Sequence, residues 1–189
     1  MFGNLLSNIL IEKLVVDGKL FIRPFSPEKL QVTQYPLLAR EIHFEMRKNH
    51  PEEAIQIKLD IHNFEVTKEP FIFQPNEYVI VVVKEQIVLP DGIVARFIPQ
   101  SRLIESGFGL FAGKLDPHYG NAGEQIRFGL VNLWNRRNKY DYGSPLAYIQ
   151  FFDIRGLPVR ETKPTNYDKE IKNIRRAEYI AFNVEPGLK

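Results

Sequence analysis

Residues 78–98 read YVIVVVKEQIVLPDGIVARFI, and this stretch decides the fold class. It contains two apolar runs rich in β-branched residues, 78–83 and 93–98, each about as long as a typical β-strand. Between the runs lies Leu89-Pro90-Asp91-Gly92, whose proline, aspartate and glycine are residues that favour turns. The stretch therefore predicts short strands joined by turns rather than a helix.

The same pattern extends along the chain in both directions. From residue 55, isoleucine and leucine alternate with polar residues up to Ile61, as in a half-buried strand. Further strands are predicted at 71–73, 108–111, 126–133 and 146–154, and turn signals separate them. No helical pattern intervenes between these strands, so the sequence predicts an all-β sandwich, jelly roll or barrel.

The first 20 residues have the pattern of a short helix. Ser7 is a candidate N-cap, Ile11, Leu14 and Val15 fall on one face, and Gly18 is a candidate stop signal. The prolines that follow predict a turn and then an irregular segment through Tyr35-Pro36.

A second helix is predicted near the C-terminus, beginning at Asn166. Its basic residues indicate either a solvated helix packed on the sheet or a phosphate-binding element. We therefore expect a single domain over residues 1–189, with a helix in 1–20 and a helical C-terminal extension over 155–189.

Composition excludes several classes of protein. The 189 residues include no cysteine, which excludes a disulfide framework, thiolate catalysis and a zinc–thiolate site. The net charge of +2 argues against a nucleic-acid coat or a membrane-surface protein. No apolar run approaches the ~20 residues of a membrane span, and the first residues lack the basic region of a signal peptide. We expect a cytoplasmic protein with no nucleic-acid or membrane partner.

Residues 89–150 contain the features that suit a nucleoside site. Asp116 follows a strand and is close in sequence to Tyr119 and to glycines that allow close backbone approach. Such a carboxylate can orient water or a ribose hydroxyl, and the tyrosine ring can pack against the sugar. The alternative is a plain type I turn, for which Asp-Pro is a common opening.

A zinc deaminase is excluded by the same sequence. Residues 43–45 read His-Phe-Glu, which matches the H-x-E start of the zinc-deaminase signature. The second half of that signature requires cysteines, which this chain lacks.

Several ordered segments resemble the dCTP deaminase/dUTPase family. They are the N-terminal helix, PFSPEKLQ at 24–31 followed by Tyr35, EPF at 69–71, LPD at 89–91, LDP at 115–117 and LAYIQF at 146–151. The resemblance extends to about residue 154, and dCTP deaminase is the closer of the two activities.

This resemblance implies a jelly-roll or β-clip barrel that forms a homotrimer, with active sites shared between subunits. Family members convert dCTP to dUTP, cleave dUTP to dUMP and pyrophosphate, or do both. A glutamate activates the attacking water without zinc, and Mg²⁺ accompanies the triphosphate. The run Val79–Val83 is apolar on both sides of its strand, which we take as support for a trimer interface.

The sequence departs from the family where the chemistry takes place. The family's phosphate loop R-S-S-L-x-R corresponds here to QSRLIE at 100–105, which keeps Ser101 and places Arg102 inside the loop but ends in Glu105. A carboxylate at this position repels a triphosphate, whereas arginine would bind it.

The catalytic glutamate of the deaminases corresponds to Gly129, counted back from Asn132. Glu124 is the nearby carboxylate that could replace it if the register shifts across 120–124. The resemblance assigns Asp116 and Glu124 as candidate catalytic residues and Ser101, Arg102, Tyr119 and Gln150 as candidate substrate-binding residues.

Three functions remain open at this point. The chain is a divergent dCTP deaminase that uses Glu124, a dUTP pyrophosphatase in which Asp116 orients water, or a family member that has lost chemistry and acts as a nucleotide sensor or protein-interaction module. The first two would use Mg²⁺ bound to the nucleotide.

Overall fold

A computed structural model describes residues 4–47 and 57–157, and the side chains of 45–59 lie outside the description. The chain divides into two units at Gly156, and the described residues lie almost entirely in the first unit, Met1–Gly156. The predicted C-terminal helix lies outside the described residues. None of the helices in the described part has the length and apolar content needed to cross a membrane.

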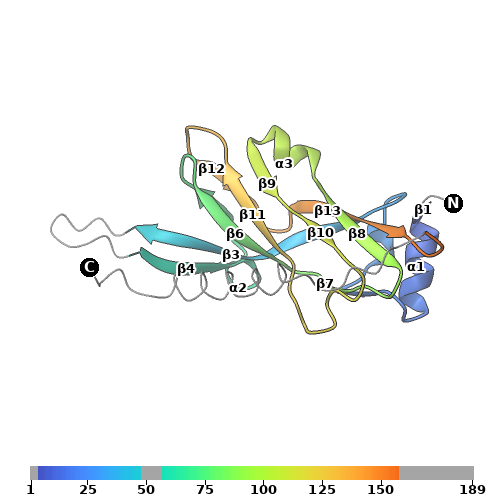
Figure 1. Ribbon diagram of the computed structural model, residues 1–189. Coiled ribbons are helices and arrows are strands. Elements are labelled where there is room, and N and C mark those ends of the chain that lie inside the picture. The colour runs from blue at the N-terminus through green and yellow to red at the C-terminus, as the bar shows by residue number, and fades with distance from the viewer. Residues whose placement is uncertain (1–3, 48–56, 158–189) are drawn as a thin grey trace. The chain divides into compact units, whose positions relative to one another are not determined.

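The first unit is built almost entirely from antiparallel strands (Figure 1). Its strands are β1 (Asn4–Leu5), β2 (Phe21–Arg23), β3 (Tyr35–Arg47), β4 (Ile57–Asn63), β5 (Phe71–Phe73), β6 (Tyr78–Val83), β7 (Gln86–Val88), β8 (Ile93–Pro99), β9 (Phe108–Phe111), β10 (Lys114–Leu115), β11 (Arg127–Asn132), β12 (Asn138–Tyr140) and β13 (Pro145–Asp153). Its helices are α1 (Asn8–Val16), α2 (Phe64–Thr67), α3 (Ser101–Glu105) and the 3₁₀ turn η1 (Pro27–Lys29). The all-β prediction is confirmed.

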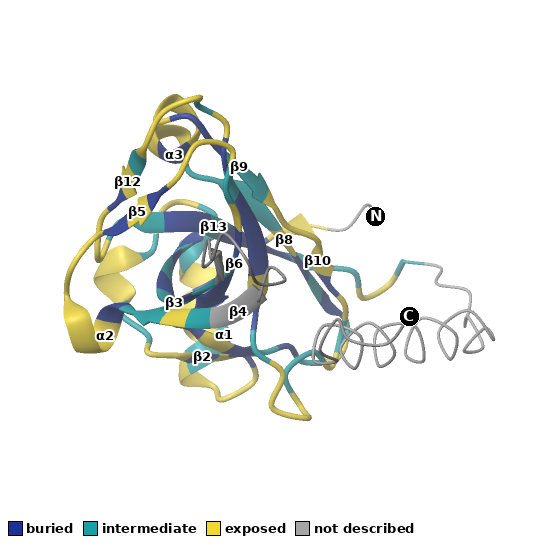
Figure 2. Cartoon of the chain, turned by 90° about the vertical axis from the view of Figure 1, so that its left-hand side faces the viewer, coloured by how far each residue is buried: buried dark blue, intermediate teal, exposed yellow. Residues whose placement is uncertain are grey.

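Nine strands form one sheet with the order β10-β8-β13-β3-β6-β11-β9, to which β1 adds beside β13 and β4 beside β3. The pairs β5–β12 and β2–β7 form two small sheets. The strands curl so that buried residues line the inside (Figure 2). Aromatic rings fill much of this interior, with Phe71, Phe73 and Phe108 in successive edge-to-face contacts at 4.8 and 4.9 Å.

Helix α1 forms as its sequence predicts. The Ser7 hydroxyl accepts a hydrogen bond from the Leu10 amide, Ile11 is fully buried, and Gly18 ends the helix with a φ of +68°. A positive φ is readily adopted by glycine, which has no Cβ, and this explains its place after the last helical turn.

Two expectations about the strands were wrong. Tyr35 and Pro36 do not end an irregular segment, because they begin the long strand β3, where Pro36 pairs with Tyr148 of β13. Ile61 is at a position predicted to be on the buried face of its strand, yet it is 54% exposed.

The apolar run in β6 does not by itself require a second copy of the chain. Val79, Val81, Val82 and Val83 are all buried within one chain, because β6 lies between β3 and β11 in the curled sheet. The trimer therefore stays a prediction that needs other support.

Glu85 is a buried carboxyl in the turn between β6 and β7. It is 3% exposed, and its Oε2 accepts a hydrogen bond from the Leu38 amide at 2.9 Å. Burial raises its pKa, and this exceeds the opposing effects of hydrogen bonds to backbone amides and of Lys29 and Lys84. The folded state therefore holds the Glu85 proton more tightly than the unfolded state does.

We predict that Glu85→Gln becomes progressively more stable than the wild type as the pH rises from about 4 to about 7. With a raised folded-state pKa, the stability that the protonated carboxyl contributes is complete at low pH and is lost as the pH rises through that pKa. The glutamine carbonyl can still accept the Leu38 bond. Thermal melts of both proteins across this range test the prediction, and a constant difference in melting temperature would contradict it.

Candidate functional site

A row of polar side chains crosses three adjacent strands on one face of the sheet. Gln150 of β13 lies opposite Arg96 of β8, and Arg96 lies opposite Lys114 of β10. Directly opposed residues in antiparallel strands share a face, so these three side chains are neighbours. Arg96 Nε donates to Gln150 Oε1 at 3.0 Å, and its guanidinium lies 4.9 Å from the Phe152 ring centre.

Asp116 joins this row through Lys114. The Lys114 ammonium donates to Asp116 Oδ1 at 2.7 Å, and the two side chains are 72% and 65% exposed. An exposed pair of this kind adds little to stability. Its carboxylate and ammonium are instead open to a ligand. The structure thus brings Asp116 and Gln150, both predicted site residues, to one face.

Tyr119 lies at the end of the turn that Asp116 begins. The Tyr119 amide donates to the Asp116 carbonyl at 3.2 Å, and His118 has a φ of +68°. With proline second and a positive φ third, this is the geometry of a type II turn rather than the type I turn considered above. Tyr119 is half-buried, and burial raises the pKa of its hydroxyl, with a smaller contribution from the charge of Glu124.

Glu124 lies in the exposed loop that precedes β11. Its Oε2 accepts a hydrogen bond from the Ala122 amide at 3.1 Å, and β11 begins only at Arg127. Glu124 is therefore not on the strand that carries Gly129.

Gly129 lies at the middle of β11, opposite Ile80 of β6 on one side and Phe111 of β9 on the other. The Tyr78 side chain lies across it, and a Cβ at this position would overlap the Tyr78 phenol. The Tyr78 ring lies 6.2 Å from that of Phe111, and the two residues are 54% and 61% exposed. An aromatic surface thus covers Gly129, the position that we match to the family's glutamate by counting back from Asn132.

His43 carries an imidazole and lies in the same row of cross-strand partners as Gly129. His43 pairs with Ile80, and Ile80 pairs with Gly129, so His43 lies two strands away from Gly129. At ~4.8 Å per strand, the Cα atoms of His43 and Gly129 are about 10 Å apart. The His43 Nε2 lies 3.1 Å from Glu41 Oε2. At this distance from Gly129 the His43 imidazole does not take the place of a side chain at residue 129.

Ser101 and Arg102 lie at the start of α3, directly after β8, and both are exposed. Four residues of extended chain lie between Arg96 and Ser101, a span of roughly 15 Å. Glu105 ends the same helix. A single chain therefore does not bring these two residues to the row that contains Asp116 and Gln150.

Sequence reasoning gave no role to three residues at these positions: Arg96, Lys114 and Tyr78. Strand register brings Arg96 and Lys114 next to candidate residues, and Tyr78 packs over Gly129. Neither relation is visible in the local sequence. A charged residue inside a strand of apolar residues, such as Arg96 in IVARFIP, is the one signal that the sequence offered.

Comparisons with known proteins identify the family. The model of dCTP deaminase-like proteins matches residues 5–152. The chain therefore belongs to the dCTP deaminase-like family.

Individual relatives are more distant. A dCTP deaminase of Pyrococcus furiosus is 29% identical over 155 residues, which cover 80% of this chain and 86% of that protein. A dUMP-forming dCTP deaminase of Nanoarchaeum equitans is 28% identical, over 79% of this chain and 84% of its own. The crystal structure of the dCTP deaminase from Agrobacterium tumefaciens shares the fold, with a TM-score of 0.60 at 14% identity. That match covers 81% of this chain but only 49% of the other.

We predict an energetic coupling of about 1 kcal/mol between Arg96 and Gln150, typical of a net hydrogen bond that is only partly shielded from water. The measurement is a double-mutant cycle of Arg96→Met and Gln150→Leu, followed by urea unfolding. Additive single effects would show that the 3.0 Å contact does not hold the row together.

Proposed function

We propose that this member of the dCTP deaminase-like family binds dCTP or dUTP but deaminates dCTP weakly or not at all. The observation that carries the proposal is Gly129, which has no side chain and lies under the Tyr78 phenol. The protein would then act as a trimeric nucleotide sensor or interaction module of pyrimidine deoxynucleotide metabolism. We also propose a cytoplasmic location.

Deamination needs a base that takes a proton from the attacking water. Residue 129 offers none, and Tyr78 covers the space where a glutamate would extend. Glu124 is bonded to the Ala122 amide in the preceding loop, and His43 is about 10 Å away across the sheet. Neither group supplies the missing base in the arrangement described.

Binding can survive the loss of this base, because most of the other candidate groups are present. Ser101 offers a hydroxyl and Arg102 a guanidinium to phosphate oxygens, whereas Glu105 weakens the attraction. Asp116 can accept a hydrogen bond from a ribose hydroxyl, with Tyr119 beside the sugar. Gln150 orients Arg96, so its role in the site is to position that guanidinium.

Mg²⁺ belongs to this proposal as part of the incoming nucleotide. Among the side chains of residues 4–44 and 60–157, no three histidines or carboxylates are grouped so as to hold a metal ion. The Mg²⁺ ion would instead be held mainly by the triphosphate oxygens. Nucleotide binding as proposed here needs no zinc.

A homotrimer explains why one chain leaves the candidate residues in separate places. Ser101 and Arg102 of one subunit could meet Asp116 of another. The exposed Phe111, Tyr78 and Leu133 offer an apolar surface for such contacts, with exposures of 61%, 54% and 61%.

dUTP hydrolysis is the second candidate function, and the Asp116–Lys114 pair favours it. A carboxylate held by an ammonium 2.7 Å away can orient a water toward a phosphate. Release of dUMP and pyrophosphate that Asp116→Asn abolishes would establish this function in place of binding alone.

We predict that the pure protein with dCTP and Mg²⁺ releases ammonia at a rate near background. Loss of the general base costs ~10²–10⁴-fold in rate. Either nucleotide should still raise the melting temperature, because a ligand that binds only the folded state stabilises it. Deamination at ordinary enzymatic rates, abolished by Glu124→Gln, would show that the loop supplies the base and that the proposal is wrong.

We predict by light scattering a mass close to three chains of 22.0 kDa each. Phe111→Asp should lower this mass, because a buried unpaired carboxylate would disrupt an apolar interface. The matched control is Val66→Asp on α2, where the side chain is 78% exposed and lies on another element. A monomeric wild type, or equal effects of the two variants, would contradict the assembly.

A further inference from the structure

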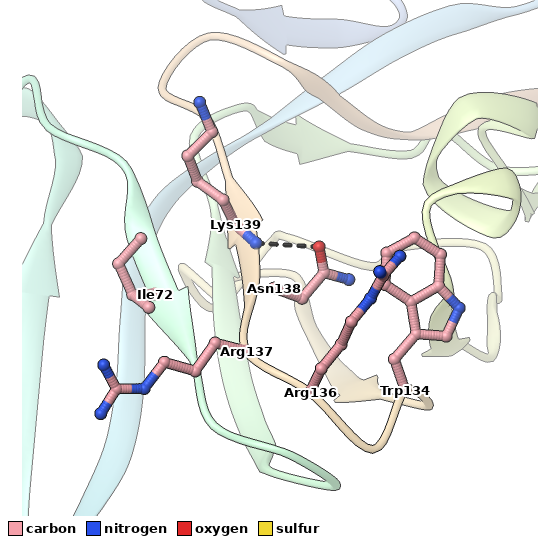
Figure 3. A pocket seen from close by; sticks show the side chains of 6 residues that line it. All are labelled: Ile72, Trp134, Arg136, Arg137, Asn138 and Lys139. Atoms are coloured by element: carbon pink, nitrogen blue, oxygen red, sulfur yellow. Dashed lines mark hydrogen bonds between the residues drawn. The ribbon is translucent and has the colours of Figure 1, made fainter.

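A basic and aromatic hollow lies at the connection between β11 and β12, outside the candidate nucleotide site (Figure 3). Its volume is about 390 Å³, and it is lined by Ile72, Trp134, Arg136, Arg137, Asn138 and Lys139. A second hollow of about 310 Å³ borders Trp134, Asn135 and Arg136. Both are shallow and open to solvent.

The charge of this segment is one-sided. Residues 133–140 read LWNRRNKY, with three cations and no carboxylate. Lys139 pairs with Asp141 at 2.9 Å, whereas in the described part of the chain neither Arg136 nor Arg137 pairs with a carboxylate. The net charge of +2 averages over the whole surface and conceals this local excess.

The aromatic and cationic groups are held in place by the fold. Trp134 packs against Gly107, where a Cβ would overlap the indole ring, and the Arg136 guanidinium lies 4.2 Å from the ring centre. Arg137 Nε donates to Gln74 Oε1 at 3.2 Å. The site is therefore largely preorganised, which lowers the entropic cost of binding.

Asn132 fixes the backbone of this connection. Its fully buried side chain donates to the carbonyls of Gln74 and Arg136 at 2.9 and 2.8 Å, and it accepts from the Trp134 amide at 3.1 Å. Asn138 adds a hydrogen bond to the Ser106 carbonyl at 2.7 Å. The segment is thus tied to two other parts of the chain.

We propose that this hollow binds single-stranded nucleic acid, with Arg136, Arg137 and Lys139 contacting phosphates and the Trp134–Arg136 pair stacking against a base. Aromatic rings and guanidinium planes beside a basic groove are the groups that recognise single strands. A free nucleotide fits less well, because small ligands are bound in enclosed pockets that bury most of their surface. An acidic peptide would use the cations but has no base to stack on Trp134.

The test is fluorescence anisotropy of a labelled oligothymidylate of about 20 nucleotides with the full chain, over a series of salt concentrations. Arg136→Gln with Arg137→Gln should weaken binding and reduce the slope of log affinity against log salt by about 1.4, or ~0.7 for each lost phosphate contact. The matched control is Lys13→Gln with Lys19→Gln, which removes two charges near α1 and should leave binding unchanged.

Trp134→Leu should weaken binding about tenfold through loss of stacking, while Trp134→Phe should keep most of the affinity. Melting temperatures establish that each variant is folded, and the phenylalanine variant keeps an aromatic ring at this position.

Several results would overturn the proposal. One is no binding of the oligonucleotide by the wild type at low salt, and another is an equal loss of affinity in the Lys13/Lys19 control. A third is competition by polyglutamate as strong as that by unlabelled oligonucleotide, which would indicate an acidic protein partner. Complete displacement by excess dCTP, with no effect of the Arg136 and Arg137 changes, would place the oligonucleotide at the nucleotide site.

Discussion

The seven-residue pairing between β8 and β13 is the constraint on which the candidate site depends. It runs from Ala147 opposite Pro99 to Asp153 opposite Ile93, and its inward side chains, including Ile149 and Phe151, are fully buried. Because side chains alternate along a strand, a slip of β13 by one residue would turn this apolar set outward and turn Gln150 inward, away from Arg96. The hydrophobic energy of the core therefore fixes the register, and the register puts Arg96 beside Gln150.

The positions of Lys114 and Asp116 follow from this pairing. Strand β10 adds to the other side of β8 and brings Lys114, and through it Asp116, into the same row. Farther along the same sheet, beyond β3 and β6, Gly129 of β11 lies under Tyr78. The sheet has a polar face with exposed charges, whereas the Tyr78 side chain covers Gly129, where deamination would need a base. This combination is the physical basis for proposing binding without deamination.

The sequence was informative where one pattern covered a whole element. Strands β5, β6, β8, β9, β11 and β13 were predicted to within about two residues, which is the usual uncertainty of element ends. Strand β3 was missed because its pairing with β6 is irregular between Ala39 and Glu41, so that buried positions shift from Leu37 and Ala39 to Ile42 and the alternation is lost. The sequence analysis missed the two- and three-residue strands β1, β2, β7, β10 and β12, which are too short to show a period. Gly129 was identified by counting from Asn132, but the Tyr78 ring above it depends on cross-strand packing that no local pattern reveals.

A crystal structure of the protein with dCTP and Mg²⁺ tests the central claim most directly, through the groups that surround C4 of the cytosine ring. The account predicts a bound nucleotide with the Tyr78 hydroxyl near the base and no carboxylate within about 3.2 Å of C4 or of a water poised to attack it. The Asp116 carboxylate should instead lie at the sugar. A Glu124 carboxylate within hydrogen-bonding distance of that water would contradict the account, because the protein would then possess the base that Gly129 lacks.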